Sequence, residues 1–167
     1  MISTAYIRTM ARYNRWQNQS IFGAADTLTD AARREDRGAF FKSIEGTLNH
    51  LLWGDMMWLH RFAATPRPSG GIAGSASRIP DWDQLKAERK AVDEAILIWS
   101  EGLEEGWLAG NLTWISSAAS REFTKPNWLL VAHFFNHQTH HRGQAHALLT
   151  AAGAKPDDTD LMLQDPA

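Results

Sequence analysis

The sequence contains no cysteine. Disulfide bonds, thiolate metal ligands and a cysteine nucleophile are therefore excluded, and imidazole and carboxylate groups remain as the ligands for a transition metal. No unbroken run of about 18 apolar residues occurs, and the first residues lack the basic segment followed by an apolar run that marks a signal peptide. We therefore expect a cytoplasmic protein without a membrane partner.

A surplus of basic residues is also missing. The chain has 17 Lys and Arg against 19 Asp and Glu, a formal net charge of −2 with its seven His counted as neutral. Neutralising a phosphate backbone needs basic surface, so nucleic acid is not an expected partner. A P-loop, a Gly-rich phosphate loop and a Gly-x-Ser-x-Gly motif are absent, which argues against nucleotide-dependent and serine-hydrolase chemistry.

The length of 167 residues predicts one domain over residues 1–167 with a substantial buried core. Apolar spacings of three and four predict a first helix over residues 6–24, capped by Ser3. A second helix, over about residues 40–62, is apolar on most of its circumference, as expected when a helix is buried on more than one side. Eight Trp residues indicate an aromatic core or an aromatic-lined cavity.

Two further helices complete the pattern. Asp81 and Gln84 resemble a capping box that opens a third helix, which ends near residues 102–106. A final helix is expected over about residues 127–152, closed by Gly153. Four helices of about twenty residues predict an all-α four-helix bundle, in which cofactor sites lie between facing helices.

Two connections differ from short loops. Residues 64–80 are rich in Pro, Gly and Ser and form a long connection between the second and third helices. Because loops beyond about 12–15 residues are uncommon in compact domains, we expect a segment without order in preference to a lid. Residues 111–116 and 121–124 predict a short hairpin before the last helix, with residues 117–120 as its turn.

Four of the seven His lie close together in the last helix: His133, His137, His140 and His141. Imidazoles at positions i and i+4 project from one face of a helix and can share a metal ion. On a helical wheel, His137 and His141 fall on the apolar face, whereas His133 and His140 border the polar side. The alternative is that the inward pair is hydrogen-bonded to neighbours or partly hydrated.

A third ligand is expected from the second helix. His50 lies near its middle, and Gly46 and Gly54, one turn away on either side, leave space for something other than side chains. His60 is better explained as an end-of-helix residue that interacts with the helix dipole. His146 points away from His137 and is expected at the surface or at a subunit contact.

Residues 49–55 (Asn-His-Leu-Leu-Trp-Gly-Asp) and residues 136–144 (Asn-His-Gln-Thr-His-His-Arg-Gly-Gln) resemble the DinB/YfiT family of metalloenzymes. The His-x-x-x-His-Arg-Gly-Gln string is the specific part of this match. Residues 13–18 are similar to the family's first-helix motif and residues 153–160 to its usual ending. The resemblance therefore spans nearly the whole chain.

The resemblance implies a four-helix bundle with a divalent metal, commonly zinc or nickel, held by three His that map onto His50, His137 and His141. Family members are often homodimers. Some relatives are thiol-dependent enzymes in which the metal activates a thiolate, so a low-molecular-weight thiol is an implied cofactor. Three imidazoles leave at least one coordination position open, as in catalytic zinc sites.

Other residues are candidates for orienting a ligand or lining a pocket over the metal: Gln144, Trp53, Gly54, Met57 and Trp16. Membership of the core is the competing explanation for the two Trp and the Met. Asp55 lies about 140° around the helix from His50, so we expect it to pair with a polar group of the first helix or of a partner subunit. Arg142 and His140 are expected to face away from the pocket.

Two functions are compatible with these features. The first is a metal-dependent enzyme, a thiol transferase or hydrolase-like protein, in which the ion activates water or a thiol toward a small-molecule electrophile. The sequence assigns no catalytic residue beyond the ligands. The second is a non-catalytic metal-binding stress-response or dimeric interaction module, with Trp128, Phe135 and His146 on the dimer surface.

Overall fold

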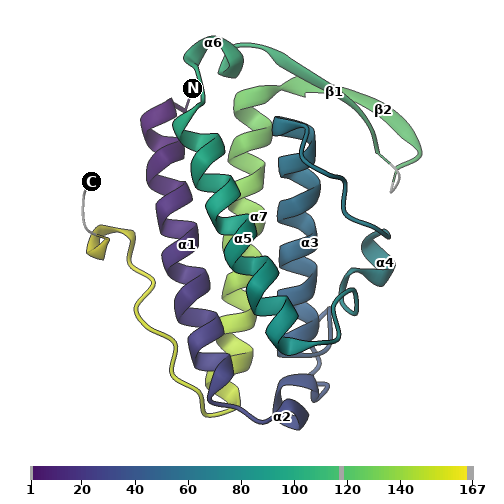
Figure 1. Ribbon diagram of the computed structural model, residues 1–167, viewed down its shortest axis with the longest axis vertical. Helices are drawn as coiled ribbons and strands as arrows, with labels where there is room; N and C mark the ends of the chain where they lie inside the picture. Colours follow the sequence, from purple (N-terminus) through teal and green to yellow (C-terminus); the bar gives the residue numbers. More distant parts are fainter. Residues whose placement is uncertain (1, 117–118, 165–167) are drawn as a thin grey trace.

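The computed structural model describes residues 2–116 and 119–164. Within these ranges, the four longest helices lie side by side: α1 (Thr4–Asp26), α3 (Ile44–Ala63), α5 (Trp82–Glu101) and α7 (Asn127–Ala151) (Figure 1). Helix α1 packs against α5 and α7, and α3 packs against the same two helices. The all-α prediction is confirmed, and α3 and α7 are neighbours, as a shared site between them requires.

The helix starts follow from their capping residues. Ser3 accepts a hydrogen bond from the backbone N–H of Tyr6 at the start of α1, and Asp81 accepts one from that of Gln84 at the start of α5. Both caps were predicted. Helix α3 begins later than residue 40, because Ser43 caps it through the backbone N–H of Gly46. The preceding residues form a turn instead of a first helical turn.

Shorter elements connect the long helices. They are α2 (Asp30–Arg34), α4 (Ile72–Ser75), α6 (Glu105–Leu108), the strands β1 (Asn111–Ser116) and β2 (Arg121–Pro126), and the 3₁₀ helix η1 (Leu161–Leu163). The strands pair in antiparallel register, with Trp114 opposite Phe123, which confirms the hairpin. Of its expected turn, residues 117–118 lie outside the described residues.

The long connection after α3 is not without structure. It contains α4, and it buries Ser75 and Ile79 against the bundle. Asn49 of α3 holds the segment through two hydrogen bonds with the backbone N–H and carbonyl of Ile79. The expectation of a segment without order is therefore wrong for its second half, because these polar and apolar contacts tie it to α3.

A charged network crosses the centre of the bundle. Asp55 of α3 accepts hydrogen bonds from Arg89 of α5 (2.7 Å) and Gln138 of α7 (3.1 Å), and Arg89 also pairs with Asp93 (2.9 Å). All four side chains are buried. The expected partner of Asp55 on the first helix or on another subunit is wrong, because α3 packs on α5 and α7.

Helix α7 is buried on more than one side, and this overturns one expectation. Arg142 faces away from the cavity at the histidines, as expected, but it is buried and donates a hydrogen bond to Asn14 of α1. Phe135 was placed on a dimer surface, but it is 1% exposed and lies in the core beside Phe134. The cause is that α7 contacts both α1 and α3, so opposite faces of this helix are covered. A homodimer stays a prediction.

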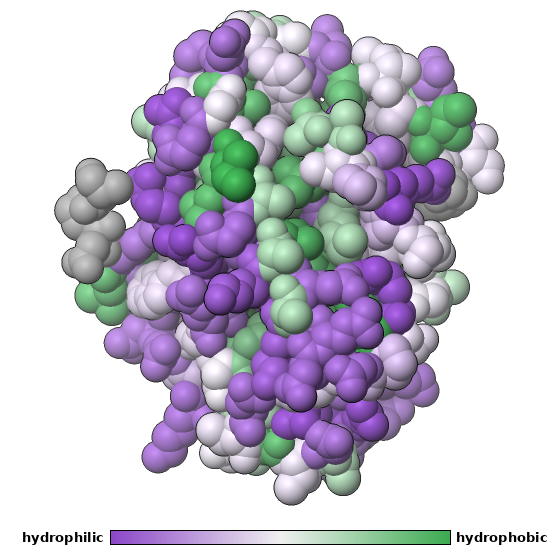
Figure 2. Space-filling model, viewed as in Figure 1, coloured by the Kyte–Doolittle hydropathy of each residue, from purple (hydrophilic) through white to green (hydrophobic). Residues whose placement is uncertain are grey.

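The surface is mostly polar on the face that Figure 2 shows, where hydrophobic residues occupy a narrow strip and small separate areas. In the described part of the chain, no helix is long and apolar enough to cross a membrane. The segment after α7 runs along the outside of α1 (Figure 1). Tyr13 and Gln17 of α1 donate hydrogen bonds to the carbonyl groups of Thr159 and Asp158 in that segment.

Candidate metal centre

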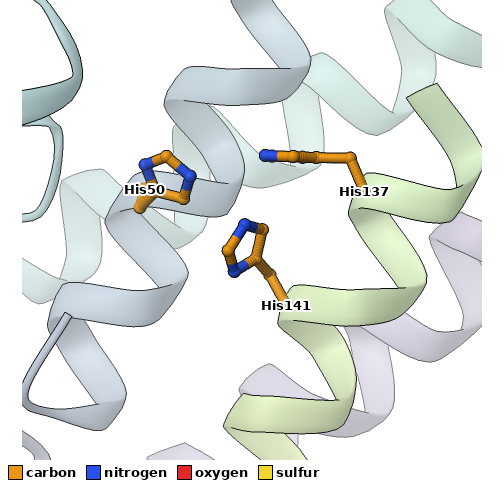
Figure 3. A group of neighbouring side chains, drawn as sticks. All are labelled: His50, His137 and His141. Carbon is orange, nitrogen blue, oxygen red and sulfur yellow. The ribbon is translucent and has the colours of Figure 1, made fainter. Parts of the chain in front are cut away.

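Three histidine side chains converge between α3 and α7. His50 comes from the middle of α3, and His137 and His141 come from successive turns of α7 (Figure 3). Their ring centroids are 4.4–5.4 Å apart. Each ring offers one nitrogen, and these three nitrogens all lie within 4.8 Å of one another. The arrangement follows from the i, i+4 spacing on one helix and the packing of the second helix against it.

The tautomer of His50 is set by the connection that covers it. Its Nδ1 lies 2.8 Å from Ser75 Oγ, and the Ser75 hydroxyl in turn donates to the carbonyl of Ile72 (2.7 Å). A hydroxyl has one proton, so Ser75 accepts from His50 and places the imidazole proton on Nδ1. The lone pair of His50 is then on Nε2, which is available as a ligand.

His141 is held in the same way. Its Nδ1 lies 2.8 Å from Gln144 Oε1, and an amide oxygen only accepts hydrogen bonds. His141 therefore carries its proton on Nδ1 and presents the lone pair of Nε2. Such partners of metal-ligating imidazoles fix the ring orientation and the tautomer. Gln144 lies where the sequence analysis expects a residue that orients a ligand.

His137 is positioned by the absence of a side chain at Gly54. A Cβ atom at this position would lie 2.7 Å from Cε1 of His137, closer than real Cβ contacts allow. At Gly46, a Cβ atom would collide with the carbonyl oxygen of Phe41. The expectation that the glycines leave space for something other than side chains is wrong at Gly54, where the His137 ring occupies that space, whereas at Gly46 the space holds the backbone of Phe41.

All three imidazoles are neutral in this environment. Burial, together with the charge of the neighbouring imidazoles, lowers the pKa of His50 to about 4 and that of His137 to about 3. Burial also lowers the pKa of His141. Neutral imidazole is the form that binds metal ions. The site is therefore deprotonated at neutral pH before any ion arrives.

Phe41 forms one wall of the site, which the residue pattern did not predict. Its ring stacks on His50 with centroids 3.8 Å apart and an interplanar angle of 19°, and it lies 5.5 Å from the His141 ring. The sequence pattern predicted one helix over residues 40–62, with Phe41 in its first turn. The turn before Ser43 instead folds the ring over His50.

A cavity of about 280 Å³ adjoins His50 and His137. Of the residues expected to line a pocket, it includes Trp53, Gly54 and Met57. The cavity is also lined by residues that the sequence analysis did not assign to it: Trp58, Arg61, Ile72, Trp114, Ser116 and His133. Several of these come from α4 and β1, whose position over α3 could not be read from hydrophobic periodicity.

Trp16 is not part of this cavity, so its expected role is wrong. It stands beside Tyr13 (centroids 5.9 Å apart) and lines a separate hollow with Lys155 and Asp157. The reason is that α1 packs on α5 and α7, away from the side of α3 that carries His50. His60 lies in the last turn of α3, with its Nδ1 2.6 Å from the carbonyl oxygen of Thr65.

The arrangement agrees with the comparison with protein families. The model of the DinB family matches residues 1–167. The chain belongs to the DinB family. It is 26% identical over 166 residues to Protein DinB of Bacillus subtilis strain 168, an alignment that covers 90% of this chain and 88% of that protein.

The fold of this DinB-family chain is shared by a solved structure. A DinB-like protein from Bacillus cereus ATCC 10987 superimposes with a TM-score of 0.63. The superposition covers 86% of this chain and 90% of that chain, at 17% sequence identity. At this identity the likeness shows the fold alone, so the site must be judged from its own residues.

Those residues fit a divalent ion. The donor set consists of three neutral imidazoles, two of them already in the tautomer that exposes Nε2. Nδ1 of His137 is buried and has no hydrogen-bond partner within residues 2–116 and 119–164. A buried ring nitrogen without a partner costs free energy, and coordination of an ion through Nδ1 would give this nitrogen a partner. The three-His site of this DinB-family chain could therefore hold a divalent metal.

Proposed function

We propose that this chain is a metal-dependent enzyme that binds one divalent ion, zinc or nickel, through His50, His137 and His141. When bound, such an ion lowers the pKa of a coordinated water or thiol and so supplies a nucleophile at neutral pH. The reaction would be the attack of that water, or of a low-molecular-weight thiol, on a small electrophilic molecule. The observation that carries the proposal is the convergence of three neutral imidazoles beside a cavity.

The chain's own residues have separable parts in this proposal. Ser75 and Gln144 hold two of the imidazoles with their lone pairs available. Trp53 and Met57, both more than nine-tenths buried, form an apolar wall beside the histidines and exclude bulk water from that side. The cavity leaves room for a substrate next to His50 and His137. This room favours an enzyme over a module whose metal is only structural, because a closed structural site has no use for it.

Metal content tests the ligand set. The full chain, prepared without a polyhistidine tag, is expected to take up one zinc or nickel ion per chain, measured by mass spectrometry of the elements. His137→Ala is expected to lose most of this content, whereas His146→Ala, on the same helix but outside the triad, keeps it. Full occupancy in His137→Ala would contradict the proposed ligand set.

Cobalt substitution then tests whether a coordination position is open to a substrate. Adding 2-mercaptoethanol to the Co²⁺-loaded chain is expected to produce a thiolate-to-cobalt charge-transfer absorption band. A band with azide but none with the thiol would support activation of water alone. If neither addition changes the spectrum, the coordination sphere is closed and the non-catalytic metal-binding module is the better explanation.

A further inference from the structure

One cationic side chain lines the cavity without a carboxylate partner. Arg61, in the last turn of α3, lines the cavity that adjoins His50 and His137. Its guanidinium lies 4.5 Å from the ring centroid of Trp58 and 5.8 Å from that of Trp114. Among the described residues, no carboxylate oxygen lies within 4.0 Å of it. The buried Arg33 and Arg89 each pair with an aspartate, and the buried Arg142 donates a hydrogen bond to the amide oxygen of Asn14.

The surroundings of Arg61 are unfavourable for an unpaired charge. The side chain is half-buried, and its burial, together with the positive charge of Arg67, lowers its pKa. Stacking on indole rings compensates part of the desolvation. A guanidinium also has five N–H donors in a plane that matches a carboxylate. An anion in the cavity would satisfy these donors and the local positive charge together.

The walls next to Arg61 are apolar and flat. Trp53, Met57, Trp58 and Trp114 line the cavity together with Arg61 and the histidines His50 and His137. Indole rings favour planar apolar groups that can stack or meet them edge to face. The volume of about 280 Å³ lies just below the usual range for ligand cavities, which limits the occupant to a small molecule.

A second donor also lacks an acceptor. Trp53 lines the cavity and is only 8% exposed. Its indole Nε1 is buried and has no hydrogen-bond partner in the part of the chain that the structure describes. Buried donors are nearly always paired, so an oxygen acceptor is expected from something that enters the cavity. An oxygen-bearing anion in the cavity would supply acceptors for both Arg61 and Trp53.

We propose that the cavity binds small planar carboxylates, with the carboxylate on Arg61 and the planar body between the Trp walls. The inference deepens the proposed function, on which it rests only for the claim that the other end of the molecule reaches His50 and His137. Arg61 is a specificity-determining residue in this scheme. A neutral molecule of the same shape would leave its charge unpaired and would bind more weakly.

Calorimetric titration of the chelator-treated, metal-free chain tests the proposal, because a carboxylate then has no ion to coordinate. Benzoate is the probe, and benzamide is its neutral counterpart. The wild-type chain is expected to bind benzoate at least tenfold more tightly than benzamide. Arg61→Gln is expected to remove this preference, and Arg61→Lys to retain part of it, since the charge remains but the planar pair of donors is lost.

Arg121→Gln is the matched control. Arg121 also stacks on an aromatic ring, that of Phe123 (4.4 Å), but it does not line the cavity, so its loss should leave the preference unchanged. Equal affinity of the wild-type chain for the two probes, including no measurable binding of either, would overturn the proposal. So would an unchanged preference in Arg61→Gln. If benzoate binds as expected while the chain takes up no metal, the proposed function fails and the carboxylate site stands.

Discussion

Replacing Gly54 by Ala is the sharpest test of the histidine geometry. The added Cβ would lie 2.7 Å from Cε1 of His137. Carbon atoms pack comfortably at about 3.5 Å, so the ring must shift by about 0.8 Å, or the helices must separate by a similar amount. His137 cannot make this shift and keep its nitrogen in the same place relative to His50 and His141.

The substitution removes no metal ligand, yet the expected loss of metal affinity is large. Disturbing the support of a metal ligand typically costs 10–100-fold in affinity, which corresponds to about 1.4–2.8 kcal/mol. The same substitution would ordinarily favour a helix by about 0.5–1 kcal/mol, because Gly is a poor helix former. A gain in stability of the metal-free chain would therefore not mask the effect, since the two quantities are measured separately.

Competition with a chromogenic zinc chelator gives the affinity, and urea denaturation of the metal-free chain gives the stability. Gly23→Ala is the control, because a Cβ at that position of α1 meets no atom within 4 Å. It should leave zinc affinity unchanged and stabilise the chain by about 0.5–1 kcal/mol. If Gly54→Ala binds zinc as tightly as Gly23→Ala does, the close approach of the His137 ring to α3 is not what shapes this site.

Three further results are expected. Ser75→Ala should weaken zinc binding by about 10–100-fold in the chelator assay, because His50 loses the acceptor that sets its tautomer, whereas Ser77→Ala, at an exposed position, should not. Arg89→Met should lower the free energy of unfolding by about 3–5 kcal/mol, because two buried aspartates lose their counter-ion; a loss below 1 kcal/mol would refute this. The metal-free chain should be most stable above about pH 6.5 and lose stability as the pH falls toward about 3, because the unfolded chain binds a proton on His137 that the folded chain does not bind. In His137→Leu, the free energy of unfolding, measured by urea titration at each pH, should fall less steeply over the same pH range. An identical fall would contradict the lowered pKa of His137.

The positions of the four long helices could be predicted because each carries a local signal. Ser3 and Asp81 cap their helices as expected, and periodic apolar residues mark the lengths. The i, i+4 spacing of His137 and His141 could likewise be read directly, since it depends on one helix only. Convergence with His50 required α3 and α7 to be neighbours, which the resemblance to the family implied and the packing of the helices bears out.

The residues that were missed depend on segments without periodicity. Phe41 and Ser75 reach His50 from a turn and from a short helix in a Gly-rich connection, where chain direction is set by tertiary contacts. Phe135 was misplaced for a different reason: the wheel assumed one buried face, but α7 is covered on opposite sides. A single helical wheel cannot describe a helix of that kind.

The chain has no cysteine with which to cross-link itself, yet His50 and His137 belong to opposite halves of the sequence. An ion bound by both would fasten α3 to α7 much as a disulfide staples distant segments, but reversibly. Because the unfolded chain would retain only the two neighbouring histidines of α7, the ion would favour the folded state, and the melting temperature would rise with the free metal concentration. Metal supply in the cell would then govern how long the protein survives as well as what it does.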